Sequence, residues 1–263
     1  MSKVDQLIAQ ARQTRSMGKR FGLLGKACEK RRPDPLKHVP SLLASSKAGD
    51  RELGIQIARW SGALTERYAL AEPFLFVGLA DRSAAVALQA IYALGRFYPL
   101  GMPARIRDAI LNFAEHPSPD VREAVAYSVS GSNTRKATDA LIQLSQDTDP
   151  DVRNWATFAL GSEFRTDSPA LRKALYARVK ESDHEIRNEA ICGLAVRKDP
   201  RAFRLIKNEL NQTHISYLAI DAADALGDAR LYPILQQFPA IWHKKRSFQY
   251  ALESCHPKKE GRR

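Results

Sequence analysis

Three cysteines and six histidines are the side chains best suited to nucleophilic or metal-binding chemistry in this chain. Cys28, Cys192 and Cys255 lie far apart, and none belongs to a Cys-x-x-Cys pair of the kind that zinc and redox sites use. The histidines are equally scattered, and the sequence has neither a His-Glu-x-x-His nor a Gly-x-Ser-x-Gly motif. A Gly-Lys pair at 18–19 lacks the other residues of a phosphate-binding loop. We therefore expect no catalytic residues, no metal site and no cofactor.

The cysteine count and the hydropathy pattern indicate where the protein works. An odd number of widely spaced cysteines argues against a disulfide framework and favours a reducing compartment. Cys192 lies between Ile191 and Gly193 in an apolar segment, so we expect a buried, unreactive thiol. The sequence has no apolar stretch of about 18 residues and no apolar N-terminal region of a secretory signal. We predict a cytoplasmic protein without membrane contact.

An alanine-rich apolar pattern returns six times along the chain. In its clearest copy, residues 151–161, Val152 is followed by small residues four and seven positions later and by an apolar residue at the eighth. Five further anchors begin the same frame, at intervals of 31–35 residues: Leu53, Val86, Val121, Ile186 and Leu218. A repeat of this length is typical of a solenoid, in which stacked units share a continuous core.

Each repeat has the spacing of two helices. In the first helix, the anchor and the small residues that follow it share one face. Gly95, Gly161 and Gly227 come where this helix should stop, and we expect them to adopt the left-handed conformation that ends helices. The second apolar helices are predicted at 103–115, 136–146, 169–181, 201–211 and 230–238.

Acidic and basic residues recur beside the anchors. An acidic residue precedes the anchor in three repeats, where we expect it to cap the first helix. An arginine follows the anchor in the same repeats, and we expect these arginines to form a structural ladder between successive units: Arg122, Arg153 and Arg187.

The position three residues after each anchor is mostly polar. It carries Gln56, Gln89, Ala124, Trp155, Glu189 and Asp221. We infer that this position faces outward or lies at a flank of the helix. Because tryptophan is enriched among interface hot spots, Trp155 is a candidate hot spot. The alternative is that Trp155 packs beneath a neighbouring loop.

The net charge of +12 is concentrated at the ends of the chain. Residues 1–47 carry 11 Lys/Arg and 3 Asp/Glu, and residues 240–263 carry 7 and 2. The body at 48–239 carries 23 and 24, so the repeats are neutral in sum. A nucleic-acid-binding array is expected to carry a basic stripe, and this neutrality argues against one.

The motifs resemble HEAT repeats, in particular the short bacterial subtype also found in phycobilisome-lyase-like proteins. Three repeats carry its acid-apolar-Arg start, as in Asp151-Val152-Arg153, and three carry its Ala-Leu-Gly end, as in 159–161. The resemblance covers about 45–240 and implies an all-α, right-handed α-solenoid of about six to seven HEAT-like helical-hairpin repeats with capping helices. We predict three segments: a basic capping region with a degenerate first repeat (1–47), the repeat array (48–240), and a basic cap that ends in a disordered tail (241–263).

A narrower resemblance lies in the C-terminal half. Segments 151–161, 186–201 and 225–235 are similar to HEAT-repeat immunity proteins encoded beside Rhs-type polymorphic toxins. That resemblance implies a cytoplasmic protein that neutralises a toxin domain by binding it. The second helices of HEAT arrays line the concave face, which implies that a protein partner contacts the polar residues of these helices: Arg105, Asp139, Gln143, Arg172, Tyr176, Arg204 and Lys207.

The leading hypothesis is a non-enzymatic protein-binding module, an immunity or adaptor protein. One alternative is a nucleic-acid-binding protein resembling HEAT-like DNA glycosylases. Its phosphate contacts would come from the basic ends: Lys19, Arg20, Lys30, Arg31, Arg32, Lys244, Lys245 and Arg246. A second alternative is a lyase that acts on a bilin chromophore. The lyase alternative rests on the repeat subtype alone.

Overall fold

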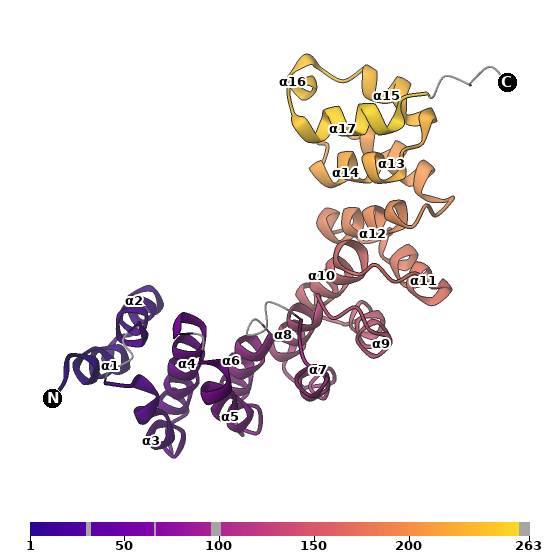
Figure 1. Cartoon of the computed structure of the whole chain (residues 1–263). Helices are drawn as coiled ribbons and strands as arrows, with labels where there is room; N and C mark the ends of the chain where they lie inside the picture. Colours follow the sequence, from indigo (N-terminus) through magenta and orange to yellow (C-terminus); the bar gives the residue numbers. More distant parts are fainter. Residues whose placement is uncertain (30–32, 66, 96–100, 258–263) are drawn as a thin grey trace. The chain divides into compact units, whose positions relative to one another are not determined.

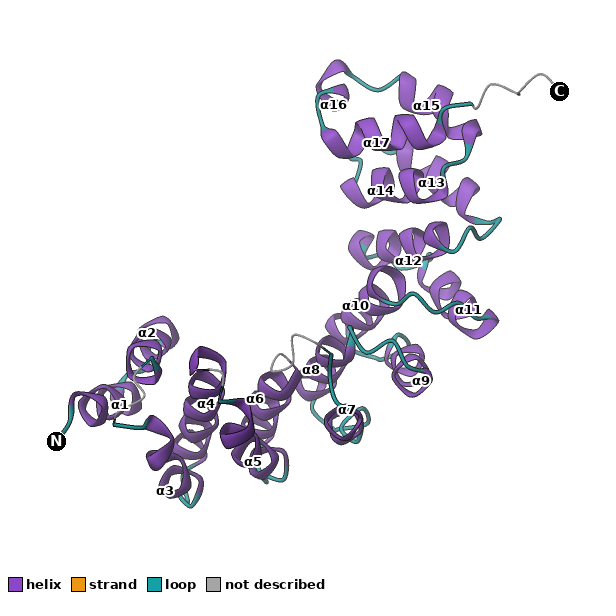
Figure 2. Cartoon of the chain, in the orientation of Figure 1, coloured by secondary structure: helices purple, strands orange, loops and turns teal. Residues whose placement is uncertain are grey.

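The computed structural model describes residues 1–29, 33–65, 67–95 and 101–257 (Figure 1). Every regular element in these ranges is a helix (Figure 2). The chain divides into two compact units, Met1–Val129 and Ser130–Arg263, and the division falls between α8 and α9.

Unit 1 consists of helices that pack in a row. Its elements are α1 (Lys3–Gln13), α2 (Met17–Cys28), η1 (Pro35–His38), α3 (Val39–Leu43), α4 (Ala48–Thr65), α5 (Tyr68–Leu79), α6 (Ala84–Gly95), α7 (Ala104–Leu111) and α8 (Pro119–Val129). The first helices α4, α6 and α8 follow one another, and each of α5 and α7 packs against the first helices on both sides of it.

Unit 2 repeats this arrangement. Its elements are α9 (Arg135–Leu144), α10 (Pro150–Phe158), η2 (Ala159–Glu163), α11 (Pro169–Arg178), α12 (His184–Val196), α13 (Ala202–Leu210), α14 (Tyr217–Leu226), η3 (Ala229–Leu231), α15 (Tyr232–Gln236), α16 (Ala240–His243) and α17 (Arg246–Cys255). Helices α10, α12, α14 and α17 pack in order, and the second helices α9, α11 and α13 lie beside them.

The repeat frame corresponds to the core. All six anchors lie in first helices, and five of them are fully buried, whereas Leu218 is half-buried. The small residues that follow are buried as well, for example Ala156 and Ala159 on α10 and η2. Small side chains let neighbouring first helices approach closely, so the alanines serve packing.

The predicted role of the glycines is correct for one repeat only. Gly227 ends α14 in the left-handed conformation, with φ 62°. Gly95 and Gly161 do not have positive φ. A side chain at Gly95 would overlap Ser128, and a Cβ at Gly161 would lie 2.7 Å from the carbonyl oxygen of Glu189. These two glycines are therefore needed because adjacent first helices touch there.

A buried arginine closes the turn at the end of the fourth repeat's first helix. The element η2 is a single π-turn, and Arg197 from the end of α12 lies over it. The Arg197 guanidinium donates to five backbone carbonyls at 2.8–3.3 Å: those of Leu160, Gly161, Phe164, Thr166 and Gly193. The orphan carbonyls of a helix end are thus satisfied by a side chain from the next repeat.

The predicted helix caps lie two residues upstream of the expected positions. Asp149 accepts from the backbone N–H groups of Asp151 and Val152, and Asp183 accepts from those of Glu185 and Ile186. Asp151 and Glu185 are exposed instead. A side chain caps a helix from the residue before its first turn, which explains the shift.

The arginine after the anchor holds the preceding turn. In Arg122, Arg153 and Arg187, Nη1 donates to the carbonyls six and five residues upstream, at 2.8–3.3 Å. Arg51, which lies two residues before the anchor Leu53, makes the same two hydrogen bonds, at 3.0 Å. The guanidinium groups of Arg51, Arg153 and Arg187 also pair with an acid at or just after the end of the following second helix, as in Arg187 Nε to Glu209 at 2.9 Å. These contacts correspond to the predicted ladder, with Arg51 as a further member.

The ends of the chain pack onto the repeats. Helix α1 packs on α2, and α2 packs on α4. At the other end α17 packs on α14 and buries Phe248, Ala251 and Cys255. Residues 258–263, which make up most of the predicted tail, lie outside the described residues. The segment boundaries predicted at 47 and 240 stay predictions.

Candidate functional site

The second helices of unit 2 each bury one face and expose the other. A pair of buried residues four positions apart marks the inner face of each: Ala137 and Leu141, Leu171 and Leu175, and Ala202 and Ile206. The positions two and six residues after the first member are exposed on all three helices: Asp139, Gln143, Lys173, Ala177, Arg204 and Asn208. Tyr176 and Lys207, five residues after it, are exposed on α11 and α13.

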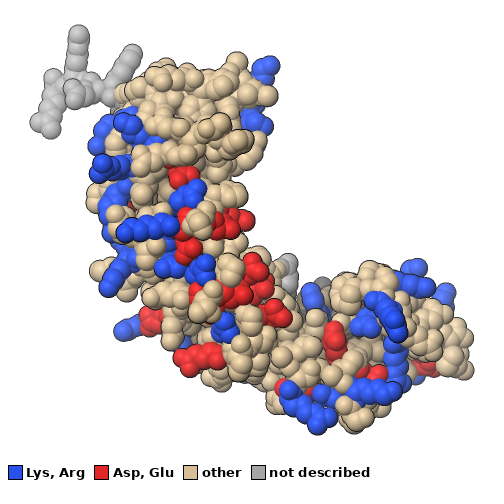
Figure 3. All heavy atoms as spheres, turned by 180° about the vertical axis from the view of Figure 1, so that it is seen from behind, with Lys and Arg blue, Asp and Glu red and all other residues tan. Residues whose placement is uncertain are grey.

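Charge is separated between the two kinds of helix. Helices α9, α11 and α13 carry seven Lys/Arg and two Asp/Glu, whereas α10, α12 and α14 carry two and five. Figure 3 shows the result as Lys and Arg gathered along the left edge of unit 2, with Asp and Glu on the neighbouring surface. The neutral sum of 48–239 thus hides a basic surface, and the sequence-based argument from neutrality was wrong for this unit.

Tyr176 and Arg201 connect two of these basic second helices. The Arg201 guanidinium carbon lies 4.1 Å from the centroid of the Tyr176 ring, which is a cation–π contact between α11 and the start of α13. Arg201 Nε and Nη2 each donate to Asp199, at 2.8 Å. Asp199 is 2% exposed, and it also accepts from Arg172 at 3.4 Å.

The next repeat has the same arrangement. Arg230 lies 3.8 Å from the centroid of the Phe203 ring and donates to both oxygens of Asp228. Arg201 and Arg230 are 29 residues apart, and each follows an aspartate by two positions. Sequence reasoning missed both stacked arginines, although the repeated Asp-x-Arg at 199–201 and 228–230 was a usable signal.

The predicted partner-binding residues fall into two groups. Tyr176 is exposed on α11, and Arg204 and Lys207 are exposed on α13, which the contact between Tyr176 and Arg201 joins to α11. Arg172 is half-buried and is engaged by Asp167, Asp199 and the carbonyl of Arg197. These contacts hold the Arg172 side chain between two repeats, so it is less available to a partner than an exposed arginine is.

The remaining predicted contacts lie outside this group. Asp139 on α9 is exposed and pairs with Arg135 at 3.7 Å, and Gln143 is exposed on the same helix. Arg105 belongs to unit 1, where it pairs with Glu72 at 2.9 Å.

Trp155 lies at the flank of α10 and is half-buried. Its ring meets Phe158 edge-on, with centroids 5.8 Å apart. Of the equivalent positions, Gln56, Ala124 and Glu189 are buried, Gln89 is half-buried and Asp221 is exposed. The prediction that this position faces outward is therefore wrong for three of the repeats. The printed ring contact of Trp155 is within its own helix, and its role as a hot spot stays a prediction.

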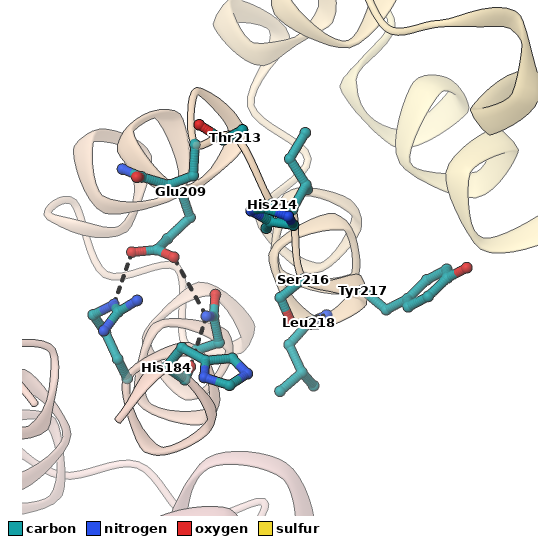
Figure 4. Close-up of a pocket in the computed structure, with 11 residues that line it drawn as sticks. His184, Glu209, Thr213, His214, Ser216, Tyr217 and Leu218 are labelled. Atoms are coloured by element: carbon teal, nitrogen blue, oxygen red, sulfur yellow. Dashed lines mark hydrogen bonds and ion pairs between the residues drawn. The ribbon is translucent and has the colours of Figure 1, made fainter. Parts of the chain in front are cut away.

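A groove of about 580 Å³ opens between α12, α13 and α14 (Figure 4). Glu209 lines the groove. Its carboxylate accepts hydrogen bonds from Arg187, at 2.9 Å, and from the side-chain amide of Asn188, at 3.3 Å. His184 and His214 lie at its edge and are exposed. Sequence reasoning did not place these two histidines in one groove, because they come from different repeats.

The predicted phosphate-contacting residues belong to both units. Lys19 is exposed on α2, and Arg20 donates to the carbonyl of Thr14 at 3.2 Å. Lys244 is exposed, Lys245 lies 5.3 Å from the Tyr217 ring centroid, and Arg246 donates to the Tyr250 hydroxyl at 2.6 Å. Residues 30–32, which include Arg31 and Arg32, lie outside the described residues.

The described residues hold no group of three or more His, Cys, Asp or Glu side chains placed to bind a metal ion. Within the same ranges, no helix combines the length and the apolar character that a membrane span requires. Burial raises the pKa of Cys192 to about 12 and that of Cys28 to about 11, which leaves these thiols protonated.

Comparison with known families agrees with this architecture. The family of HEAT repeats matches residues 72–161 and 138–227, which together span more than half of the chain. The chain belongs to the HEAT-repeat family. The HEAT repeats confirm the predicted all-helical solenoid, and their second helices carry the basic surface described above.

The HEAT-repeat chain is similar to YibA from Escherichia coli (strain K12), with 33% identity over 162 residues. The match covers 60% of this chain and 57% of YibA, so it spans little more than half of that relative. The X-ray structure of Escherichia coli YibA aligns over 97% of both chains, with a TM-score of 0.75 and 24% identity.

Two larger assemblies contain chains of the same fold. A chain from the structure in which Kap95p binds RanGDP aligns with 95% of this HEAT-repeat chain, with a TM-score of 0.66 and 15% identity. A chain from the S. pombe condensin Cnd3–Cnd2 subcomplex aligns with 96% of it, with a TM-score of 0.60 and 16% identity. The match covers 39% and 37% of those chains, respectively.

Proposed function

We propose that this HEAT-repeat protein is a non-enzymatic binding module, of the immunity or adaptor kind, that holds a protein partner on the second-helix side of unit 2. One observation carries the proposal: exposed Lys173, Tyr176, Arg204 and Lys207 lie on α11 and α13, the second helices that carry the excess of positive charge. We call these four residues the α11–α13 surface. Tyrosine and arginine are the residue types that most often anchor protein interfaces.

Two further points support a protein partner. The solved chains of the same fold come from structures in which Kap95p binds RanGDP and Cnd3 is complexed with Cnd2. The segments at 151–161 and 186–201 also resemble immunity proteins of Rhs-type toxins, which favours a polymorphic toxin domain as the partner.

The test is retention of a partner by the purified protein. Tagged wild type is expected to retain a specific protein from native lysate, and the double variant Tyr176→Ala/Arg204→Ala is expected to lose it. Arg165→Ala is the matched control, because Arg165 is also an exposed arginine of unit 2 but is not on the α11–α13 surface. Retention by neither protein, or equal retention by both, would count against the proposal.

The immunity role has a sharper test. Co-expression with the toxin domain encoded by a neighbouring gene should restore growth with wild type and not with Tyr176→Ala/Arg204→Ala. If the toxin domain arrests growth and the wild-type protein does not restore it, the immunity role is rejected. The adaptor role is then the part of the proposal that remains.

A further inference from the structure

We propose that the α11–α13 surface takes an acidic segment of a partner protein, with successive carboxylates bound along α13 by Arg201, Arg204 and Lys207. This inference rests on the proposed function and specifies the chemistry of the partner.

Arg201, Arg204 and Lys207 form a row. They are spaced three residues apart at the start of α13 and along it, so they lie on one face of the helix. At a rise of about 1.5 Å per residue, the row spans roughly 9 Å. Carboxylates on alternate residues of an extended chain are about 6.6 Å apart, and those on successive turns of a helix are about 6 Å apart. Either form places two carboxylates against the row.

The cations of the row keep donors available. Arg204 and Lys207 are exposed, and within the described part of the chain their side chains form no hydrogen bond or ion pair. Lys173 on α11 is likewise exposed, and its side chain has no hydrogen bond or ion pair with the described residues. Arg201 uses Nε and Nη2 on Asp199, which leaves Nη1 without a partner among the described residues.

Arg201 is also preorganised. Its guanidinium is fixed from one side by the Tyr176 ring, at 4.1 Å, and along one edge by the nearly inaccessible Asp199. A guanidinium that is already ordered loses little side-chain entropy when it binds a carboxylate. The free Nη1 edge is therefore a fixed docking point, next to the two exposed cations Arg204 and Lys207.

The charge of the whole molecule favours the same partner. The chain carries a net charge of +12, which attracts an acidic protein from a distance. The second helices of unit 2 hold seven Lys/Arg against Asp139 and Glu209, and Glu209 is paired with Arg187. Acids in the adjoining turns pair with Arg172 and Arg178. Lys173, Arg204 and Lys207 keep their charge without an acidic partner among the described residues.

Nucleic acid fits this surface less well. Proteins that bind duplex DNA through its backbone commonly make about 6–10 phosphate contacts, and the row with Lys173 supplies four cations. Asp139 on α9 interrupts any continuation of the basic stripe in that direction. The Tyr176 ring is covered on one face by Arg201, so that face is closed to a stacked base.

The probe is a fluorescein-labelled peptide of alternating glutamate and glycine, titrated with the full-length protein and followed by fluorescence anisotropy at low salt. Wild type is expected to bind it. The double variant Arg204→Glu/Lys207→Glu is expected to weaken binding about tenfold or more, the effect of losing one good contact. The control Arg165→Glu/Lys180→Glu makes the same change in net charge, at exposed unit 2 residues that are not on the α11–α13 surface. It is expected to weaken binding about twofold or less through the long-range field alone.

Two results would overturn the proposal even if wild type binds the peptide. Equal loss in both double variants would mean that the peptide senses only net charge. Tighter binding of a labelled DNA duplex than of the peptide, with the same sensitivity to Arg204→Glu/Lys207→Glu, would assign the row to nucleic acid. Thermal unfolding of each variant verifies that it is folded, since substitutions at exposed sites change stability little.

The outcome is separable from that of the proposed function. If wild type retains a protein partner through Tyr176 and Arg204 but does not bind the acidic peptide, the binding module stands and the acidic partner is rejected. If the peptide binds through Arg204 and Lys207 but no protein is retained, the chemistry of the surface stands and the adaptor role is rejected.

Discussion

Arg201 stacks on Tyr176 across the boundary between two repeats, with 4.1 Å between the guanidinium carbon and the ring centroid. This contact joins a residue that the sequence pointed to, Tyr176, with one that it did not. The Arg201 guanidinium that stacks on Tyr176 also donates two hydrogen bonds to Asp199. Arg201 therefore contributes both to the packing between repeats and to the proposed binding row.

Replacement of Arg201 by alanine should destabilise unit 2 by about 1–3 kcal/mol. The buried carboxylate of Asp199 would lose two hydrogen bonds of 2.8 Å and keep only Arg172, at 3.4 Å. Urea unfolding of Arg201→Ala and Arg204→Ala checks this, with the exposed Arg204 as the control. Equal stability of the two variants would contradict the structural role given to Arg201.

The same pair predicts a pH dependence. Hydrogen bonds from Arg201, and further from Arg172, lower the pKa of Asp199 from 3.8 to about 2. A carboxyl with a depressed pKa stabilises the folded state fully above its unfolded pKa of about 3.9, and this is lost as the pH falls toward about 2. The shift corresponds to roughly 2 kcal/mol. Urea unfolding between about pH 5 and pH 2.5 should therefore show a steeper loss for wild type than for Arg201→Ala.

Alanine at Gly193 or Gly161 should destabilise the protein by about 1–3 kcal/mol or more, because the first helices touch there. A Cβ at Gly193 would lie 2.6 Å from the Cα of Gly161 and 2.8 Å from a methyl group of Leu175. Gly131→Ala is the control, since a Cβ there meets nothing within 4 Å. Differential scanning calorimetry should show a lower Tm for the first two variants alone. An unchanged Tm for Gly193→Ala would mean that the helices separate without cost.

Arg197→Met should cost about 3 kcal/mol or more, because five carbonyls that accept from Arg197 would lose their donor in a buried site. Arg197→Lys is expected to rescue little, since an ammonium group has three donors and cannot match the planar fork. Guanidinium-induced unfolding measures both, and Arg165→Met is the exposed control. Full rescue by lysine would show that charge alone, without the fork, closes the η2 turn.

All three thiols should be inert in the native protein. Burial is the main cause that raises the pKa of Cys28 and Cys255 to about 11 and that of Cys192 to about 12. Near pH 8 these thiols therefore hold little thiolate. An ordinary cysteine, with a pKa of about 8.5, holds much more at the same pH. A chromogenic disulfide reagent should react slowly with folded protein and rapidly with all three thiols in denaturant. A fast native phase would identify an accessible cysteine.

The sequence by itself determined the repeat, the helix pairs and the core. Val152, Ala156 and Ala159 can be recognised without a structure because helical spacing puts them on one face, and burial of that face is a local consequence of residue type. The exposed side of the second helices followed from the same periodicity. Tyr176, Arg204 and Lys207 could therefore be named as surface residues from the sequence alone.

The tertiary structure decided which of these residues meet. Arg201 and Tyr176 are 25 positions apart, and no local spacing rule relates them; their contact depends on how α11 and α13 stack on α12. Gly161 and Gly193 likewise owe their role to the distance between first helices and not to their own backbone angles. Net charge summed along the chain hid the basic side of unit 2, because residues of opposite charge alternate in sequence from helix to helix, and only packing sorts those helices onto different sides.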